Sequence, residues 1–287
     1  MNKEIYHIKN LKCQYKTSPF PVLEIDELKI QEKSIVFFIG SSGVGKSTIL
    51  ETLGLMNNTI DNNVQDTIFN FSLNGYNENL MTFWKKKERD IAKFRKKHLS
   101  FIFQSTNLFT TLSTYDNTII TSLLQGKSKA EAHQSAKEIF SKIFPELKED
   151  KNVTELSGGQ RQRIAFARAI VAEYSILFAD EPTGNLDYGT ADLLMNELIN
   201  IIRKNNKTAI IVSHDINLAI KYADKIVLIE KKINDYSDRK FNYGKISENS
   251  VYHKHSEKKW INNQNNLFED KEMLSYLTEL LISNTKN

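Results

Sequence analysis

The residues best suited to chemistry in this sequence are a lysine and a serine that follow a glycine-rich segment. The segment matches the pattern G-x-x-x-x-G-K-[ST] with Gly40, Gly45, Lys46 and Ser47 at the fixed positions. Glycines let the backbone turn tightly and point successive N–H groups at phosphate oxygens. A lysine ammonium then supplies positive charge to the phosphates, and a serine hydroxyl suits Mg²⁺. The segment therefore predicts a nucleotide-binding loop, which also contains Ser41, Ser42, Gly43, Val44 and Thr48.

Further polar residues stand where apolar runs end. Gln104 follows the run 99–103, Asp180 and Glu181 follow 176–179, and His214 comes soon after 208–212. Buried carboxylates are costly unless they hold a metal or a water molecule. A lone histidine after a strand usually has a structural role. We expect a functional role for His214, because the other strand ends also carry residues that can bind phosphate or a metal ion. Ligands of parallel sheets bind beyond the carboxyl ends of the strands, so we expect these residues to form one site.

A second anion-binding helix start is predicted at Ser157. Leu156 to Arg163 precedes a breaker-free run, 164–172, and Ser157 is a suitable N-cap. The free N–H groups of the residues after it would attract an anion. Taken alone, Ser-Gly-Gly would be an ordinary linker.

The elements that must position these residues alternate along the chain. We predict strands at 3–15 (as an edge strand), 22–30, 35–39, 66–75, 99–103, 176–179, 208–212 and 226–229, with helices at 127–144 and 191–204. Apolar strands separated by helices indicate a largely parallel sheet covered by helices.

The composition is typical of a globular protein. The chain has 287 residues, of which 40% are hydrophobic, and a formal charge of +4, so it can form a sizeable core and shows no charge bias toward nucleic acid. The basic segment 82–98 is interpreted as a surface helix. The single cysteine, Cys13, excludes an intrachain disulfide and fits a reducing compartment as a small buried residue. No apolar run reaches the length of a membrane span, which predicts a cytoplasmic protein whose membrane contact comes only through a partner.

Together these motifs resemble the ATP-binding ATPase subunit of ABC transporters over residues 3–248. The resemblance rests on the phosphate loop, Gln104, the signature 156–160, Asp180, Glu181, Asp187 and His214, all in the family's order. It implies the ABC ATPase fold: an α/β P-loop NTPase core with a largely parallel sheet, an antiparallel β-subdomain and a helical subdomain at about 105–172. Residues 180–187 are similar to those of the branch with lipoprotein-releasing, macrolide-efflux and cell-division ATPases.

The resemblance also implies a cofactor and a partner. ATP and Mg²⁺ would bind at a head-to-tail dimer interface, with each nucleotide between the phosphate loop of one chain and the signature of the other. Ser157, Gly158, Gly159 and Gln160 would close over the partner's nucleotide, and Asp187 would organise the interface.

Catalytic roles follow from the same resemblance. Lys46 and Ser47 would bind phosphate and Mg²⁺, and Gln104 would contact the metal or the attacking water. Asp180 would hold Mg²⁺ through water. Glu181 would be the general base, and His214 would contact the γ phosphate.

Adenine recognition is assigned to Tyr15 by the resemblance. Tyr6 is a rival for that role, and a core position in a strand is the alternative for Tyr15.

The sequence departs from the family's pattern in three places. The residues after Gln104 lack the proline and glutamate that relatives often have, which puts the details of permease docking in question. Residues 231–243 lengthen the closing hairpin. Beyond the ATPase domain, 1–248, lies an extension, 249–287, with a helix predicted at 267–282 for packing or partner binding. His253 and His255 do not by themselves indicate a metal site.

Two functions of different classes remain open. The first is an ATPase that drives a separate integral membrane permease, as a homodimer on the cytoplasmic face. The second is an ATP-gated regulatory module that signals through a membrane partner without transport, as in cell-division relatives. A soluble relative acting on ribosomes or DNA is disfavoured, because the chain has one phosphate loop and no zinc-binding cysteines.

Overall fold

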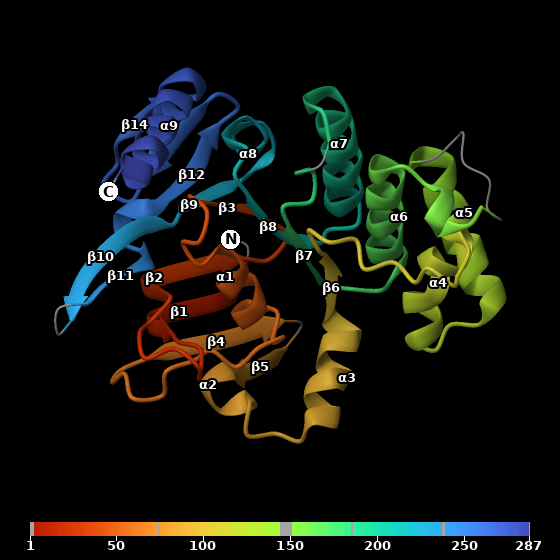
Figure 1. The fold of residues 1–287 in the computed structure, drawn as a ribbon, viewed down its shortest axis with the longest axis horizontal. Coiled ribbons are helices and arrows are strands. Elements are labelled where there is room, and N and C mark those ends of the chain that lie inside the picture. Colours follow the sequence, from red (N-terminus) through yellow and green to blue (C-terminus); the bar gives the residue numbers. More distant parts are fainter. Residues whose placement is uncertain (1–2, 74, 144–150, 185, 237–238, 287) are drawn as a thin grey trace. The chain divides into compact units, whose positions relative to one another are not determined.

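The computed structural model describes residues 3–73, 75–143, 151–184, 186–236 and 239–286 (Figure 1). These residues form two compact units, one with residues 1–91 and 210–287 and the other with 92–209. Two positions of the predicted elements, Asn74 and Phe144, lie outside the described residues.

The first unit contains a six-stranded sheet in the order β10-β11-β2-β1-β4-β5. Its strands are β1 (Glu4–Cys13), β2 (Leu23–Gln31), β4 (Ile68–Leu73), β5 (Tyr76–Asn79), β10 (Glu230–Tyr236) and β11 (Arg239–Ile246). The short helix α2 (Leu80–Phe83) follows β5. The prediction that the first strand is an edge was wrong. Because β4 pairs with its other side, for example Tyr6 with Phe71, β1 lies inside the sheet.

A second sheet in this unit is built on a parallel pair. The wholly buried strand β3 (Ile35–Ile39) runs parallel to β9 (Lys225–Leu228), as the apolar runs predicted. From β9 the sheet continues through the antiparallel strands β12 (Val251–Ser256), β13 (Lys259–Asn262) and β14 (Leu267–Glu269). The helices of this unit include α1 (Lys46–Leu53), α8 (Ile216–Tyr222) and α9 (Asp270–Lys286).

The extension after residue 248 is therefore part of a sheet. Its predicted helix begins at Asp270 rather than Leu267, because residues 267–269 pair with β13 as a strand. Trp260 is fully buried, and its indole Nε1 donates to Asp270 Oδ1 at 2.9 Å. Since Met273 is also buried, the first turns of α9 are fixed against the core of the first unit.

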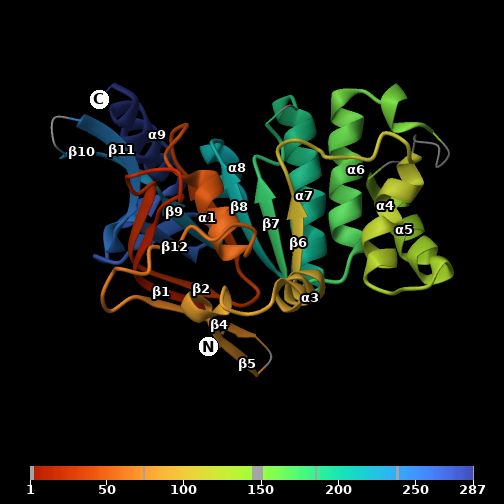
Figure 2. The ribbon, with the colours of Figure 1, turned by 60° about the horizontal axis from the view of Figure 1, so that its bottom comes forward.

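The second unit holds a parallel pair of strands and most of the helices. Strand β6 (Leu99–Ile102) pairs with β7 (Ile176–Asp180), and Phe101 stacks on Phe178 with ring centroids 5.2 Å apart. Helices α4 (Thr114–Leu124), α5 (Lys129–Ile143) and α6 (Gly158–Val171) lie side by side (Figure 2) and bury Ala136, Ile119 and Phe166. The unit also contains the 3-10 helix η1 (Val153–Glu155) and α7 (Tyr188–Lys204).

Two elements span the residues where the units divide, namely α3 (Glu88–His98) and β8 (Thr208–Ser213). Helix α3 carries the basic segment that we predicted as a surface helix.

In the described part of the chain, no helix is both long and apolar enough to cross a bilayer. Cys13 is fully buried, and burial raises the pKa of its thiol to about 11.

Candidate functional site

The glycine-rich loop connects β3 to α1 in the first unit. Gly43 and Gly45 have φ angles of 75° and 94°, in the left-handed region that glycine adopts without strain. Gly45 is the N-cap of α1 and offers no side chain to its first turn. No side chain therefore caps the N–H groups at this helix start, which suits the binding of an anion.

The loop shows features that suit phosphate groups. Lys46 turns back over the loop, where its Nζ donates to the carbonyl oxygens of Gly40 and Ser41, each at 3.0 Å. The Ser41 hydroxyl is buried and has no hydrogen-bond partner within the described protein atoms. Buried polar groups are normally satisfied, so this hydroxyl fits a site that a ligand oxygen completes. Ser47 is exposed in the first turn of α1, where its hydroxyl can reach a metal ion.

Strands far away in the sequence hold the loop in shape. A Cβ on Gly40 would stand 2.7 Å from Val44 Cγ1 and 3.1 Å from the carbonyl oxygen of Ile229, which follows β9. On the other side, Gly244 of β11 is hydrogen-bonded through its N–H to the carbonyl of Val22 at 2.8 Å. A Cβ on Gly244 would meet Val44 O at 2.0 Å. This role of Gly244 was not among the predictions from sequence, although a glycine inside a strand indicates a close backbone approach.

The two candidate adenine-binding tyrosines have different surroundings. Tyr6 is a core residue, because it is 1% exposed and its hydroxyl donates to Leu53 O at 2.9 Å. Tyr15 is partly exposed beside α1, where its hydroxyl bonds Thr48 Oγ1 at 3.1 Å and Glu51 Oε2 at 3.0 Å. Burial raises the pKa of Tyr15, with a further contribution from Glu51, so the hydroxyl stays protonated at neutral pH. Tyr6 is thus removed as a rival, and Tyr15 lies next to the phosphate loop.

His214 also belongs to the first unit. It is exposed directly after the buried strand β8 and before Asp215, which caps α8 by accepting from Leu218 N at 3.1 Å. The strand end and the helix cap together fix the backbone of His214.

The second unit brings the glutamine and the two acids together at one edge. Ile102 pairs with Ala179, so Gln104 follows β6 at the same end of the pair where Asp180 ends β7. Parallel strands share their carboxyl-terminal edge, as we predicted for these residues. Glu181 has a φ of 45°, an outlier for a residue with a side chain. Such strain costs about 1–3 kcal/mol and is common at functional sites.

The predicted signature begins a helix with both capping bonds made. Ser157 Oγ accepts from Gln160 N at 3.2 Å, and Gln160 Oε1 accepts from Ser157 N at 3.0 Å. Ser157 and Gly158 are exposed, and a Cβ on Gly158 would meet nothing within 4 Å. The start of α6 therefore presents open N–H groups at an accessible surface.

Two further contacts join the signature helix to the neighbouring site segments. Gln162, which is 2% exposed, donates from Nε2 to the carbonyl of Pro182 at 2.7 Å, directly after Glu181. Gly159 lies beside Leu186, whose Cδ2 would be 3.2 Å from an added Cβ. Gln162 was not among the residues predicted from sequence, because only the fold brings it close to Pro182.

Asp187 is the N-cap of α7, and its carboxylate accepts from Thr190 N at 3.0 Å. The hydrogen bonds from Thr190 hold the pKa of Asp187 below its usual value, so the carboxylate is ionised at neutral pH. The predicted residues therefore form two sets: the phosphate loop, Tyr15 and His214 in the first unit, and Gln104, the acids, the signature and Asp187 in the second.

Comparison with known proteins shows that the chain is similar to ATP-binding proteins of ABC transporters. The ABC transporter family profile matches residues 23–184. The LolD ATP-binding protein of the lipoprotein-releasing system of Desulfotalea psychrophila is 30% identical over 233 residues, which cover 80% of this chain and 99% of that protein. The uncharacterised ABC transporter ATP-binding protein YbbA of Escherichia coli K12 is 35% identical over 218 residues, covering 76% and 90%.

A solved structure shows the same fold. The ATP-binding cassette MJ0796, described as a dimer in a post-hydrolysis state bound to ADP and phosphate, matches with a TM-score of 0.64. It is 28% identical to this chain, and the match covers 78% of this chain and 93% of that one.

Proposed function

The chain belongs to the ABC transporter family of ATP-binding ATPases, and we propose that two copies close around two ATP molecules to drive a separate membrane permease. It is an ATP-binding cassette that converts ATP to ADP and phosphate. Three parts of this are our proposal: the head-to-tail arrangement, the separate integral membrane permease, and the location of this ATPase on the cytoplasmic face of the membrane.

One observation carries the proposal. The chain has two helix starts that suit an anion. One, at Gly45 in the first unit, has no side-chain cap, and the other, at Gly158 in the second unit, is exposed. A single nucleotide has one γ phosphate, so two such starts serve it only if they meet. A dimer in which the loop of one chain faces the signature of the other uses both, and the dimeric state of MJ0796 supports this assembly.

Each site residue then has a role that its chemistry suits. Mg²⁺, when bound, neutralises charge on the β and γ phosphates. We assign Ser47, Asp180 and Gln104 to its coordination, directly or through water. Lys46 neutralises phosphate charge, and its present bonds to loop carbonyls show that the ammonium already lies over the loop.

The proton transfer is assigned to Glu181. Its carboxylate would accept the proton of the water that attacks the γ phosphorus, while His214 holds a γ phosphate oxygen. The strained backbone of Glu181, which follows Asp180 at the end of a buried strand, supports a functional position for this side chain. Pro182 directly follows Glu181, and the hydrogen bond from Gln162 to the Pro182 carbonyl would couple the position of Glu181 to that of the signature helix α6.

A mixing experiment tests the composite site. Lys46→Ala damages only the phosphate loop and Ser157→Arg damages only the signature, so a mixed head-to-tail dimer has one intact site and one doubly damaged site. We expect this mixture to regain ATP-dependent dimerisation, while either variant alone stays near background. Dimerisation is measured with two affinity tags, after crosslinking has shown that chains exchange.

The matched control places both substitutions in one chain and mixes it with wild type. In a head-to-tail mixed dimer neither site is then intact, whereas an arrangement in which each chain uses its own loop and signature would leave the wild-type site whole. ATP-dependent association of tagged mixed dimers in this control, together with none in the first mixture, would overturn the proposal.

A further inference from the structure

A cavity of about 270 Å³ lies in the first unit, away from the phosphate loop. Its walls come from β2, from the start of β9, and from the extension through β12, the 3-10 helix η2 (Glu248–Ser250) and the residues after β13. Sites for drug-sized ligands begin at roughly 300 Å³, so this cavity suits a smaller molecule.

A buried lysine lines this cavity. Lys225 is 3% exposed, and its ammonium donates to the carbonyl of Lys29 and, at 2.7 Å, to Oε1 of Gln31. Both acceptors are neutral, and among the described residues no carboxylate lies within ion-pair distance of Lys225. The charge of Glu4 acts on Lys225 only from farther away and opposes the effect of burial in part. Burial lowers the pKa of Lys225 to about 8, so the group is still largely charged at neutral pH. A buried charge without a close counter-ion is costly, and an anion in the cavity would compensate it.

The other charges of the lining leave one carboxylate unmatched. Lys29 and Glu27 neutralise each other with Nζ and Oε1 3.3 Å apart. His253 pairs with Lys225 across the strands β12 and β9, and burial followed by the charge of Lys225 lowers its pKa to about 4, so it is neutral. Glu248 lines the cavity as an exposed carboxylate, and no ion pair is found for it within the described part of the chain.

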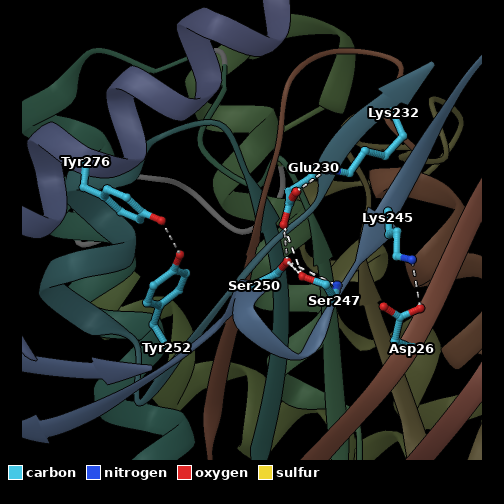
Figure 3. Close-up of polar contacts among 8 residues, drawn as sticks. All are labelled: Asp26, Glu230, Lys232, Lys245, Ser247, Ser250, Tyr252 and Tyr276. Carbon is cyan, nitrogen blue, oxygen red and sulfur yellow. Dashed lines mark hydrogen bonds and ion pairs between the residues drawn. The ribbon is translucent and has the colours of Figure 1, made fainter. Parts of the chain in front are cut away.

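The wall that carries Glu248 is held in place by a polar network (Figure 3). Ser250 donates from Oγ to Glu230 Oε1 at 2.6 Å, and the Ser247 and Ser250 hydroxyls lie 2.8 Å apart. Asn263 donates from Nδ2 to the carbonyl of Glu248 at 2.7 Å. A site whose wall is fixed before binding loses less entropy when a ligand enters.

We infer that this cavity binds a small zwitterion, a free α-amino acid, with its carboxylate on Lys225 and its ammonium toward Glu248. A di- or trianion such as phosphate is disfavoured by the carboxylate of Glu248, and a simple amine is disfavoured by Lys225. A molecule that carries one charge of each sign complements both unmatched groups.

The test is calorimetric titration of the full chain, without nucleotide, with each common amino acid. We expect at least one to bind with a dissociation constant below about 1 mM. Its N-acetyl derivative, which keeps the carboxylate but lacks the ammonium, and its amide, which lacks the carboxylate, should bind at least about tenfold more weakly. Because no ATP is present, failure here is distinguishable from failure of the ATPase proposal.

Two substitutions test separately whether Lys225 and Glu248 contact the ligand. Glu248→Gln should weaken binding about threefold to tenfold, as expected for an exposed ion pair. Lys225→Met should weaken it about a hundredfold or more, with thermal unfolding used to confirm that this variant folds. Glu257→Gln, an exposed change in the same extension, is the matched control and should bind like wild type.

Three results would overturn the inference. They are the absence of heat for every amino acid up to about 10 mM, an unchanged affinity in the folded Glu248→Gln protein, or equal binding of inorganic phosphate. If Lys225→Met does not fold, Glu248→Gln and the two ligand derivatives still decide the outcome.

Discussion

Gly244 touches the phosphate loop at Val44, although 200 residues separate them. An added Cβ on Gly244 would stand 2.0 Å from the carbonyl oxygen of Val44 and 2.7 Å from Cγ2 of Ile229. No side chain fits in that space, so β11 serves as a rigid support for the backbone that we propose binds phosphate.

Replacing Gly244 by alanine should damage both the fold and nucleotide binding. Overpacking of this kind usually costs about 1–3 kcal/mol, and part of the strain would displace Val44. We expect a lower urea midpoint and an ATP affinity reduced about tenfold, measured with a fluorescent nucleotide. Asn242→Ala, an exposed change in the same strand, is the control and should leave both unchanged. Wild-type nucleotide affinity in Gly244→Ala would refute the supporting role.

Tyr15 allows its ring and its hydroxyl to be tested separately. If the ring stacks on adenine, Tyr15→Ala should weaken ATP binding by about 1–3 kcal/mol, whereas Tyr15→Phe should keep most of the affinity and lose only the bonds to Thr48 and Glu51. Tyr6→Phe is the control, because it removes a core hydrogen bond to Leu53 and should lower stability alone. Equal affinities for wild type and Tyr15→Ala would exclude the stacking role.

Glu181→Gln should separate binding from chemistry. Loss of a general base usually slows the reaction by about two to four orders of magnitude, while Lys46, Ser47 and Asp180 still bind the nucleotide. Single-turnover hydrolysis with the variant in excess over ATP measures this step. Glu155→Gln, an exposed change before the signature, should retain the wild-type rate. Single turnover by Glu181→Gln near the wild-type rate would assign the base elsewhere.

Stability should fall in acid because of His253. Its pKa is lowered to about 4 in the fold, against about 6.5 in the unfolded chain, by burial and by the charge of Lys225. Between these values the unfolded state binds more protons, so the free energy of unfolding falls as the pH drops from about 6.5 to about 4.

After allowance for the partial exposure of His253, the loss is about 1–2 kcal/mol. His253→Gln should remove this part of the pH dependence, and His255→Gln, an exposed neighbour, should not. Urea unfolding at a series of pH values gives the comparison. Parallel curves for wild type and His253→Gln would contradict the prediction.

Local patterns in the sequence were sufficient to locate the two elements that we propose bind phosphate. The loop from Gly40 to Thr48 is contiguous, so its glycines, lysine and serine can be recognised from the sequence alone. The helix start at Ser157 could also be located from the sequence, because its capping box involves only Ser157 and Gln160, three positions apart. Apolar runs likewise predicted β3, β6 and β7, because a strand buried on both faces has few polar positions.

Tertiary structure decided every contact between residues distant in sequence. The first strand became an interior strand only because β4 pairs with it, and residues 267–269 became a strand because β13 offers an edge. The support of Val44 by Gly244, the bond from Gln162 to Pro182 and the burial of Lys225 beside Gln31 have no local signature. The spacing of apolar residues indicates which face of a helix or strand is buried, but not which other element packs against that face. Only the packing of the tertiary structure determines that neighbouring element.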